Sequence, residues 1–178
     1  MSSHAYPVFD TGLMINDELC AYMIKYAYAT FPENVANNAA VLEALKLSDE
    51  DFILAAKEGT LSDEFTDPGL LADFIEDDEE MKDLIRLSCF EGYAETDQDI
   101  SKAYELDESQ TVYIDFDYTS YGAYISLSKE ANLFRQAYST PADVVDELVS
   151  AIGPYGKFVP KDFNMIPLIC TIKGVVFG

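Results

Sequence analysis

Carboxylates are the reactive groups that this sequence supplies in greatest excess. The 178 residues include 33 Asp and Glu against 11 Lys and Arg, which gives a net charge of −22 at pH 7. Clustered carboxylates can hold a divalent metal for hydrolysis, and rows of them can imitate nucleic-acid phosphates. Acids two apart on a strand (~6.6 Å) or four apart on a helix (~6 Å) have the spacing of a phosphate row. Asp115 with Asp117 and Asp73 with Asp77 are such pairs.

The acids are concentrated in one part of the chain. Residues 60–117 contain 19 acids and 3 bases (net −16), whereas residues 1–59 contain 9 and 3 (net −6) and residues 118–178 contain 5 and 5 (net 0). This concentration favours a single acidic face, which repels nucleic-acid phosphates and membrane headgroups and attracts basic proteins or cations. We therefore expect a basic protein partner, such as a nucleic-acid-binding protein, and no direct contact with nucleic acid or membrane.

Tyrosines gather in the same region. Six of the twelve lie between residues 93 and 124, and tyrosine supplies rigid contact area at interface hot spots for little entropy. The alternative is that the tyrosines pack a sheet and the acids form its solvated outer face. The candidate partner-binding residues are Glu76, Asp77, Asp78, Glu79, Glu80, Asp97, Asp99, Asp115, Asp117, Tyr113 and Tyr121.

Familiar catalytic and metal-binding patterns are missing from the sequence. His4 is the only histidine and falls in the N-terminal tail, so no Ser-His-Asp or Cys-His arrangement is expected. Neither G-x-x-x-x-G-K-[ST] nor G-x-G-x-x-G occurs. The pairs Asp97-x-Asp99 and Asp115-x-Asp117 lack the rest of a calcium loop. The sequence therefore predicts no catalytic residue, no cofactor and no metal ligand.

The cysteines and the hydropathy pattern predict a compartment. Cys20, Cys89 and Cys170 are far apart, which suggests neither a disulfide framework nor a zinc site and fits a reducing environment. No basic segment precedes an apolar run at the N-terminus, and no stretch approaches the ~20 apolar residues of a spanning helix. We therefore expect a cytoplasmic protein. The sequence leaves its oligomeric state open.

Helical patterns fill the first third of the chain. Asn16 is a candidate N-cap, and apolar residues then recur at i, i+3, i+4 and i+7 until Pro32. A second helical segment is expected over residues 35–47. Ser48 has the spacing of a capping box for a third helix, which should end at Gly59.

A fourth helix leads into the acidic run. Asp67 followed by Pro68 is a strong helix start, because proline at the first helical position loses no needed donor. The run Glu76–Glu80 then interrupts the apolar period, which resumes at Met81. Two outcomes are open: one long helix bends through the acids, or Asp77 caps a new helix.

From about residue 88 the pattern changes to short alternating segments. The clearest strand is Thr111–Tyr118, in which Tyr113, Asp115 and Asp117 share one face. Its other face is apolar. Further strands are expected at Cys89–Glu95, Ile100–Leu106, Ala123–Ser128 and within the apolar run Met165–Phe177, with Pro167 at the strand's start or on an edge.

Together these patterns predict an α+β fold: a helical N-terminal half, then an antiparallel meander with a late helical pair and a C-terminal strand. The late helices are expected at residues 130–138 and from Pro141 to Gly153. No linker or repeat divides the chain. Residues 1–178 are therefore expected to form a single domain, with residues 1–12 either poorly ordered or an edge strand.

The leading hypothesis is a non-enzymatic acidic binding protein that engages a basic partner, as a DNA-mimic type inhibitor of a nucleic-acid-binding protein would. Two alternatives stay open: a metal-dependent hydrolase that uses clustered carboxylates, and an accessory or structural domain of a larger assembly. The first predicts binding that weakens with salt. The second predicts stabilisation by Mg²⁺ or Mn²⁺, and the third predicts salt-insensitive association through apolar surface.

Overall fold

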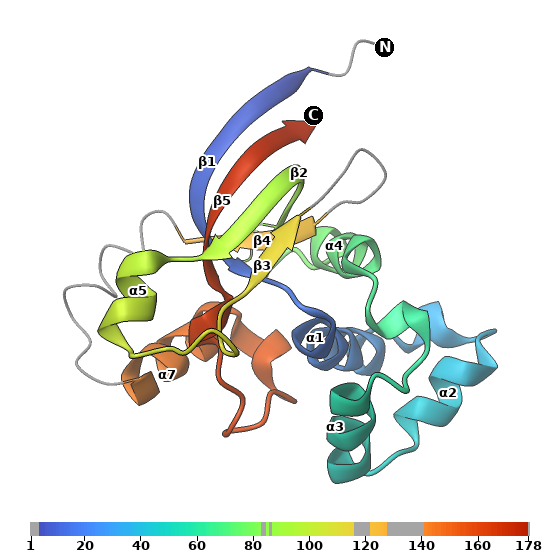
Figure 1. Ribbon diagram of the computed structural model, residues 1–178. Coiled ribbons are helices and arrows are strands. Elements are labelled where there is room, and N and C mark those ends of the chain that lie inside the picture. The colour runs from blue at the N-terminus through green and yellow to red at the C-terminus, as the bar shows by residue number, and fades with distance from the viewer. Residues whose placement is uncertain (1–3, 83–84, 86, 116–121, 128–140, 178) are drawn as a thin grey trace. The chain divides into compact units, whose positions relative to one another are not determined.

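The computed structural model describes residues 4–82, 85, 87–115, 122–127 and 141–177 (Figure 1). Backbone contacts divide the chain into two compact units. The helical unit comprises Asn16–Ile85 and Val149–Phe163, and the sheet unit comprises Met1–Ile15, Arg86–Leu148 and Asn164–Gly178. The single-domain organisation expected from the sequence stays a prediction.

The helical unit is built from short helices. Its α-helices are α1 (Asp17–Thr30), α2 (Ala39–Leu45), α3 (Asp49–Glu58) and α4 (Pro68–Asp77), and its 3-10 turns are η1 (Pro32–Val35), η2 (Asp63–Phe65) and η3 (Gly153–Gly156). The first, third and fourth helices begin where the sequence predicts. The second is shorter than predicted, because the chain first forms η1 and Asn38 then caps α2 by accepting a hydrogen bond from the Val41 amide at 3.2 Å.

Side-chain caps determine the helix boundaries that the sequence predicted. Asn16 Oδ1 accepts a hydrogen bond from the Leu19 amide at 2.9 Å, and Ser48 Oγ accepts one from the Asp51 amide at 3.2 Å. Each bond satisfies an amide that the first helical turn leaves unpaired. α3 ends at Gly59, whose φ of 64° is a left-handed conformation that glycine adopts without strain.

An aromatic cluster fills the core of the helical unit. The ring of Tyr28 on α1 meets Phe65 and Phe74 edge to face, with centroid distances of 5.7 and 5.1 Å. Phe65 in turn meets Phe52 of α3 at 5.3 Å. Edge-to-face pairs add ~0.5–1.5 kcal/mol beyond the burial of their area. The inward stripe of α1 therefore joins α3, η2 and α4 around one core.

The acidic run ends α4. The helix stops at Asp77, and Asp78 has an extended backbone, so no long helix continues through the acids. The residue that caps the following turn is Asp78, not Asp77. Its Oδ1 accepts hydrogen bonds from the amides of Glu80 and Met81 at 3.1 and 3.2 Å.

The sheet unit contains all five described strands. They are β1 (Ala5–Met14), β2 (Leu87–Thr96), β3 (Tyr113–Asp115), β4 (Gly122–Ser126) and β5 (Ile169–Phe177). Two short helical segments accompany them, α5 (Gln98–Ala103) and η4 (Ile166–Leu168), and α7 (Pro141–Ala151) spans the boundary between the units. β1 and β5 form a long curved pair in Figure 1. Their register runs from Ala5 opposite Phe177 to Leu13 opposite Ile169.

The strands close into a ring. All pairs are antiparallel, and the order of the described strands is β3-β2-β4-β1-β5, with a further pairing of β2 to β5. β1, β4 and β5 therefore each have two neighbours, and β2 has three. Closure pairs backbone groups that an open sheet would leave exposed at its edges.

Glycines allow the strands of this ring to approach. A Cβ atom at Gly12 would collide with the side chains of Tyr124 and Ile172 inside the ring. Gly92 and Gly174 face each other on β2 and β5, and a Cβ on either would meet the backbone of the opposite strand. Side chains at these positions would therefore force the strands apart.

One predicted strand is wrong. Residues 100–106 were expected to be extended, but the chain forms α5 there. Asp97 Oδ1 accepts hydrogen bonds from the amides of Asp99 and Ile100 at 3.0 and 3.1 Å, which starts a helix in place of a strand.

The other strand predictions agree with the structure wherever it describes them. β2, β4 and β5 confirm the strands predicted near residues 89–95, 123–128 and 165–177, and β3 confirms part of the strand predicted over residues 111–118. β5 lies inside the sheet, with Pro167 just before it. The rest of the strand predicted over residues 111–118 and the helix predicted over residues 130–138 lie outside the described residues.

The arrangement is the predicted α+β fold: helices dominate the N-terminal half, and strands with the late helix α7 follow. Part of the segment 1–12, which was expected to be either poorly ordered or an edge strand, lies in β1, and β1 pairs with β4 and β5. None of the helices in the described ranges is long and apolar enough to cross a membrane.

Candidate functional site

One face of the sheet unit presents aromatic side chains to solvent. Strand register places Phe9, Lys173 and Tyr93 opposite one another on β1, β5 and β2, and places Glu95 opposite Tyr113 two residues along. Alternate strand residues share a face. Phe9 is 79% exposed and Tyr113 is 65% exposed. We call Phe9, Tyr93, Glu95, Tyr113 and Lys173 the aromatic face.

Lys173 lies among the rings of the aromatic face. Its Nζ is 5.8 Å from the ring centroid of Phe9 and 5.5 Å from that of Tyr93, and it pairs with Glu95 Oε1 at 3.8 Å. The rings of Tyr93 and Tyr113 are 6.3 Å apart. The charge of Lys173 is thus balanced by Glu95, and its ammonium group is also attracted to the faces of two aromatic rings. The face therefore combines aromatic area with a neutralised ion pair.

On β2 and β5 the opposite side is a core. Ala94 and Ile172, which face each other on β2 and β5, are fully buried. Cys170 is also buried, and burial, followed by the charges of Asp97 and Glu95, raises the pKa of its thiol to about 12. A thiol that stays protonated at neutral pH is a poor nucleophile. Cys170 therefore behaves as a core residue.

The acidic run lies at the end of α4, in the helical unit. The half-buried Asp78 has a structural role: besides capping two amides, its Oδ2 accepts a hydrogen bond from the Tyr155 hydroxyl at 3.4 Å. Burial, followed by the charge of Asp78, raises the pKa of Tyr155, which keeps the phenol a donor. The other four carboxylates are exposed to solvent: Glu76, Asp77, Glu79 and Glu80.

The remaining predicted residues belong to the sheet unit. Asp97 is 6% exposed and caps α5, so it is a structural cap and not a surface charge. Asp99 is exposed on α5, and Asp115 lies opposite Tyr93 in β3. Asp117 and Tyr121 lie outside the described residues. The predicted site is thus divided between the acidic run in one unit and these residues, with Tyr113, in the other.

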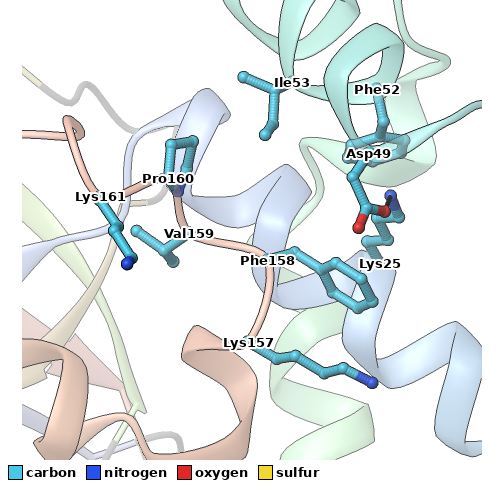
Figure 2. A pocket seen from close by; sticks show the side chains of 9 residues that line it. All are labelled: Lys25, Asp49, Phe52, Ile53, Lys157, Phe158, Val159, Pro160 and Lys161. Carbon is cyan, nitrogen blue, oxygen red and sulfur yellow. Dashed lines mark hydrogen bonds and ion pairs between the residues drawn. The ribbon is translucent and has the colours of Figure 1, made fainter.

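A pocket in the helical unit was not predicted from the sequence. It has a volume of about 190 Å³ and lies between α1, α3 and the segment 157–161 (Figure 2). Four charged side chains line it: Lys25, Asp49, Lys157 and Lys161. We call it the lysine pocket. Three of the eleven basic residues of a strongly acidic chain therefore surround one cavity.

Lys25 is the buried member of the lysine pocket. Its side chain is 7% exposed and its Nζ pairs with Asp49 Oδ1 at 2.7 Å. The same nitrogen lies 4.4 Å from the ring centroid of Phe52 and 4.5 Å from that of Phe158. In Figure 2 the ring of Phe158 lies between the ammonium groups of Lys25 and Lys157, the second at 5.2 Å from its centroid.

Lys157 and Lys161 stand at the exposed rim of the pocket. Neither forms an ion pair with a carboxylate in the part of the chain that the structure describes. The sequence offered a clue, because Lys-Phe-Val-Pro-Lys places two lysines within five residues of the neutral C-terminal third. That these lysines line one pocket with Lys25 has no counterpart in sequence spacing.

The chain matches no protein-family model, no curated protein and no solved structure. Within the described residues, no three His, Cys, Asp or Glu side chains are grouped so that they could hold a metal ion. The aromatic face, the acidic run and the lysine pocket are therefore the features from which a function must be argued.

Proposed function

We propose that this protein is a non-enzymatic acidic binding protein that engages a basic protein partner, in the way that an inhibitor mimicking DNA occupies a nucleic-acid-binding protein. The observation that supports this most directly is the aromatic face. Its exposed rings belong to a chain with a net charge of −22, a combination suited to a partner whose surface is basic and partly apolar.

The exposed rings of the aromatic face have the character of interface anchors. Large aromatic side chains dominate binding hot spots because they bury much area at low entropic cost. Phe9 and Tyr113 are both exposed, and each lies in a strand of the sheet unit. A protein partner would cover this area, and the excess of acids over bases in the chain would set the sign of the long-range field around it.

The excess of acids supplies long-range attraction. With 33 carboxylates and 11 basic side chains, at least 22 carboxylates remain unneutralised even if every base pairs with a different acid. Opposite potentials accelerate association and lose strength beyond ~8 Å at physiological salt. Binding should therefore weaken steeply as salt rises.

The test uses the full chain immobilised on a resin and nuclease-treated lysate, with stepwise salt elution and identification of the bound proteins by mass spectrometry. We expect a basic nucleic-acid-binding protein to elute at moderate salt. Tyr113→Ala should weaken capture of that protein by roughly tenfold, the scale of a hot-spot residue. Capture that resists high salt, or that Tyr113→Ala leaves unchanged, would overturn the proposal.

Matched charge variants test the acidic run within the same experiment. Glu76→Gln/Glu79→Gln/Glu80→Gln removes three exposed charges from the end of α4 and keeps the Asp78 cap. The control Glu33→Gln/Glu50→Gln/Glu58→Gln removes three exposed charges elsewhere in the helical unit. The first variant should elute at lower salt than the second. Equal elution would show that the run contributes only its net charge.

The two alternatives from the sequence have their own readouts. A metal-dependent hydrolase would be stabilised specifically by Mg²⁺ or Mn²⁺ in a thermal melt, because its clustered carboxylates would bind the ion. An accessory domain of a larger assembly would be captured through apolar surface and would resist salt. Neither outcome is expected for the proposed binding protein.

A further inference from the structure

We propose that the basic partner presents an arginine to the aromatic face, with its guanidinium group stacked on the ring of Tyr113 and paired with the carboxylate of Glu95. This inference rests on the proposed function and deepens it, because it specifies which side chain of the partner is recognised and where. The residues that would bind the arginine are Tyr93 and Glu95 on β2 and Tyr113 on β3. We call them the Tyr113 subsite.

Strand register brings the side chains of the Tyr113 subsite together. Glu95 and Tyr113 are directly opposite in the antiparallel pairing of β2 with β3, and the Cβ atoms of such a pair lie ~4.5–5.5 Å apart on one face. The ring of Tyr93 is 6.3 Å from that of Tyr113 and tilted by 33°. Because Tyr113 is 65% exposed, a flat group can cover its ring. Such a group comes within reach of the Glu95 carboxylate.

The aromatic face already holds a cation of its own beside this subsite. Lys173 Nζ lies 5.5 Å from the ring centroid of Tyr93 and 3.8 Å from Glu95 Oε1. The second distance is longer than a hydrogen bond, so Lys173 leaves the acceptor sites of Glu95 to another donor. The side chains of Lys173 and Glu95 are 37% and 38% exposed. A donor from a partner can therefore reach Glu95 from solvent.

The chemistry of the subsite favours arginine over lysine. Lys173 offsets the charge of Glu95 and repels a second ammonium group, so a compact point charge gains little there. A guanidinium group is planar and weakly hydrated, and it stacks on aromatic rings while its N–H groups point outward in its own plane. Stacked on Tyr113, it can donate to the carboxylate beside the ring. The net charge of −22 attracts basic segments in general, and the subsite then selects among them by shape.

Two labelled peptides of equal length and charge test the selection: octa-arginine and octa-lysine. Each is titrated with the full chain at about 150 mM NaCl, and binding is followed by fluorescence anisotropy. Octa-arginine should bind at least about fivefold more tightly. Tyr113→Leu should reduce this preference to less than about twofold, because it removes the ring. Tyr113→Phe keeps the ring and should preserve the preference.

A matched tyrosine variant controls for the loss of exposed aromatic area. Tyr6 is 56% exposed and lies three residues before Phe9 on β1, so its side chain leaves the opposite face of that strand. Tyr6→Leu makes the same substitution outside the subsite. It should leave the preference for octa-arginine unchanged. Circular dichroism spectra check that each variant is folded.

Removal of the internal cation gives a second, opposite signal. Lys173→Gln frees Glu95 of its competing charge and should tighten binding of octa-arginine at least about threefold. The control Lys46→Gln makes the same change in net charge at an exposed lysine of the helical unit. It should tighten binding less than about twofold, because salt screens charges that lie far from the subsite.

Three results would overturn the arginine subsite and leave the proposed function standing. They are equal affinity for the two peptides, a preference that survives Tyr113→Leu, and equal effects of Lys173→Gln and Lys46→Gln. Each would mean that a basic partner is attracted by overall charge alone. Failure of both peptides to bind even at about 20 mM NaCl, where charges are screened least, would contradict the proposed function as well.

Discussion

Lys25 places a positive charge where the helical unit could have used an apolar side chain. Its side chain, on α1, is 7% exposed, and its Nζ reaches Asp49 and the rings of Phe52 and Phe158. Asp49 keeps 71% of its side chain exposed, so it can be solvated without its partner. The packing of the stem and the charge of the head therefore make separable contributions.

Two substitutions at Lys25 separate these contributions. Lys25→Met keeps the volume of the stem and should change the free energy of unfolding by less than about 1.5 kcal/mol. Lys25→Ala removes the stem and should cost about 2–4 kcal/mol, because it leaves a cavity and strips packing from two rings. Urea unfolding followed by circular dichroism measures both. A Met variant as unstable as the Ala variant would show that the charge itself holds the core together.

At the scale of elements, α4 shows how five acids in a row can end a helix. Asp67 Oδ1 accepts a hydrogen bond from the Gly69 amide at 2.8 Å where the helix starts. At the other end Asp78 binds the amides of the next turn and the hydroxyl of Tyr155. The other acids of the run reach solvent. One carboxylate of the run is thus structural, and four are available to a partner.

Substitution within the run should reveal this division. Asp78→Ala should lower the free energy of unfolding by about 1–2 kcal/mol, the usual cost of losing a side-chain cap. Asp78→Asn keeps an acceptor oxygen and should recover much of that loss. Glu79→Ala, one residue on, should change stability by less than about 0.5 kcal/mol. Thermal melts of the three variants measure the pattern, and equal effects at both positions would contradict it.

The elements that the sequence predicted well are those with local causes. Asn16, Ser48 and Asp67 cap helices as predicted, because a cap depends on residues three positions away at most. α5 was mistaken for a strand because six residues are too few to show a helical period. Its cap, Asp97, was instead counted as a surface charge.

Closure of the sheet and assembly of the pocket could not be predicted in the same way. Gly92 and Gly174 face each other but come from distant segments, and no local sequence pattern predicts that these two glycines will be paired across strands. Lys25 likewise meets Phe158 only after the helical unit has folded. Of the predicted binding residues, Tyr113 lies in a strand that the sequence predicted, because the alternation of a strand is local.

At the scale of the whole molecule, the net charge of −22 opposes folding. Crowded like charges repel one another more in the folded state than in the expanded chain, and salt screens this repulsion. Raising NaCl from about 10 to 500 mM should therefore increase the melting temperature by roughly 5 °C. The variant Glu33→Gln/Glu50→Gln/Glu58→Gln, with three fewer charges, should show a smaller increase. A melting temperature that does not respond to salt would mean that the carboxylates are spaced too widely to repel.

The ring of strands also constrains how the chain can fold during synthesis. β1 emerges from the ribosome before any other described strand. The strand with which it forms its longest pairing is β5, which emerges after all the other described strands. Pairings between distant segments form slowly, and unpaired strands are prone to aggregate while they wait. The nascent β1 must therefore stay exposed, or be held by a chaperone, while the intervening segments are translated. The large aromatic side chains of Tyr6 and Phe9 add to the apolar surface that this strand exposes while it waits.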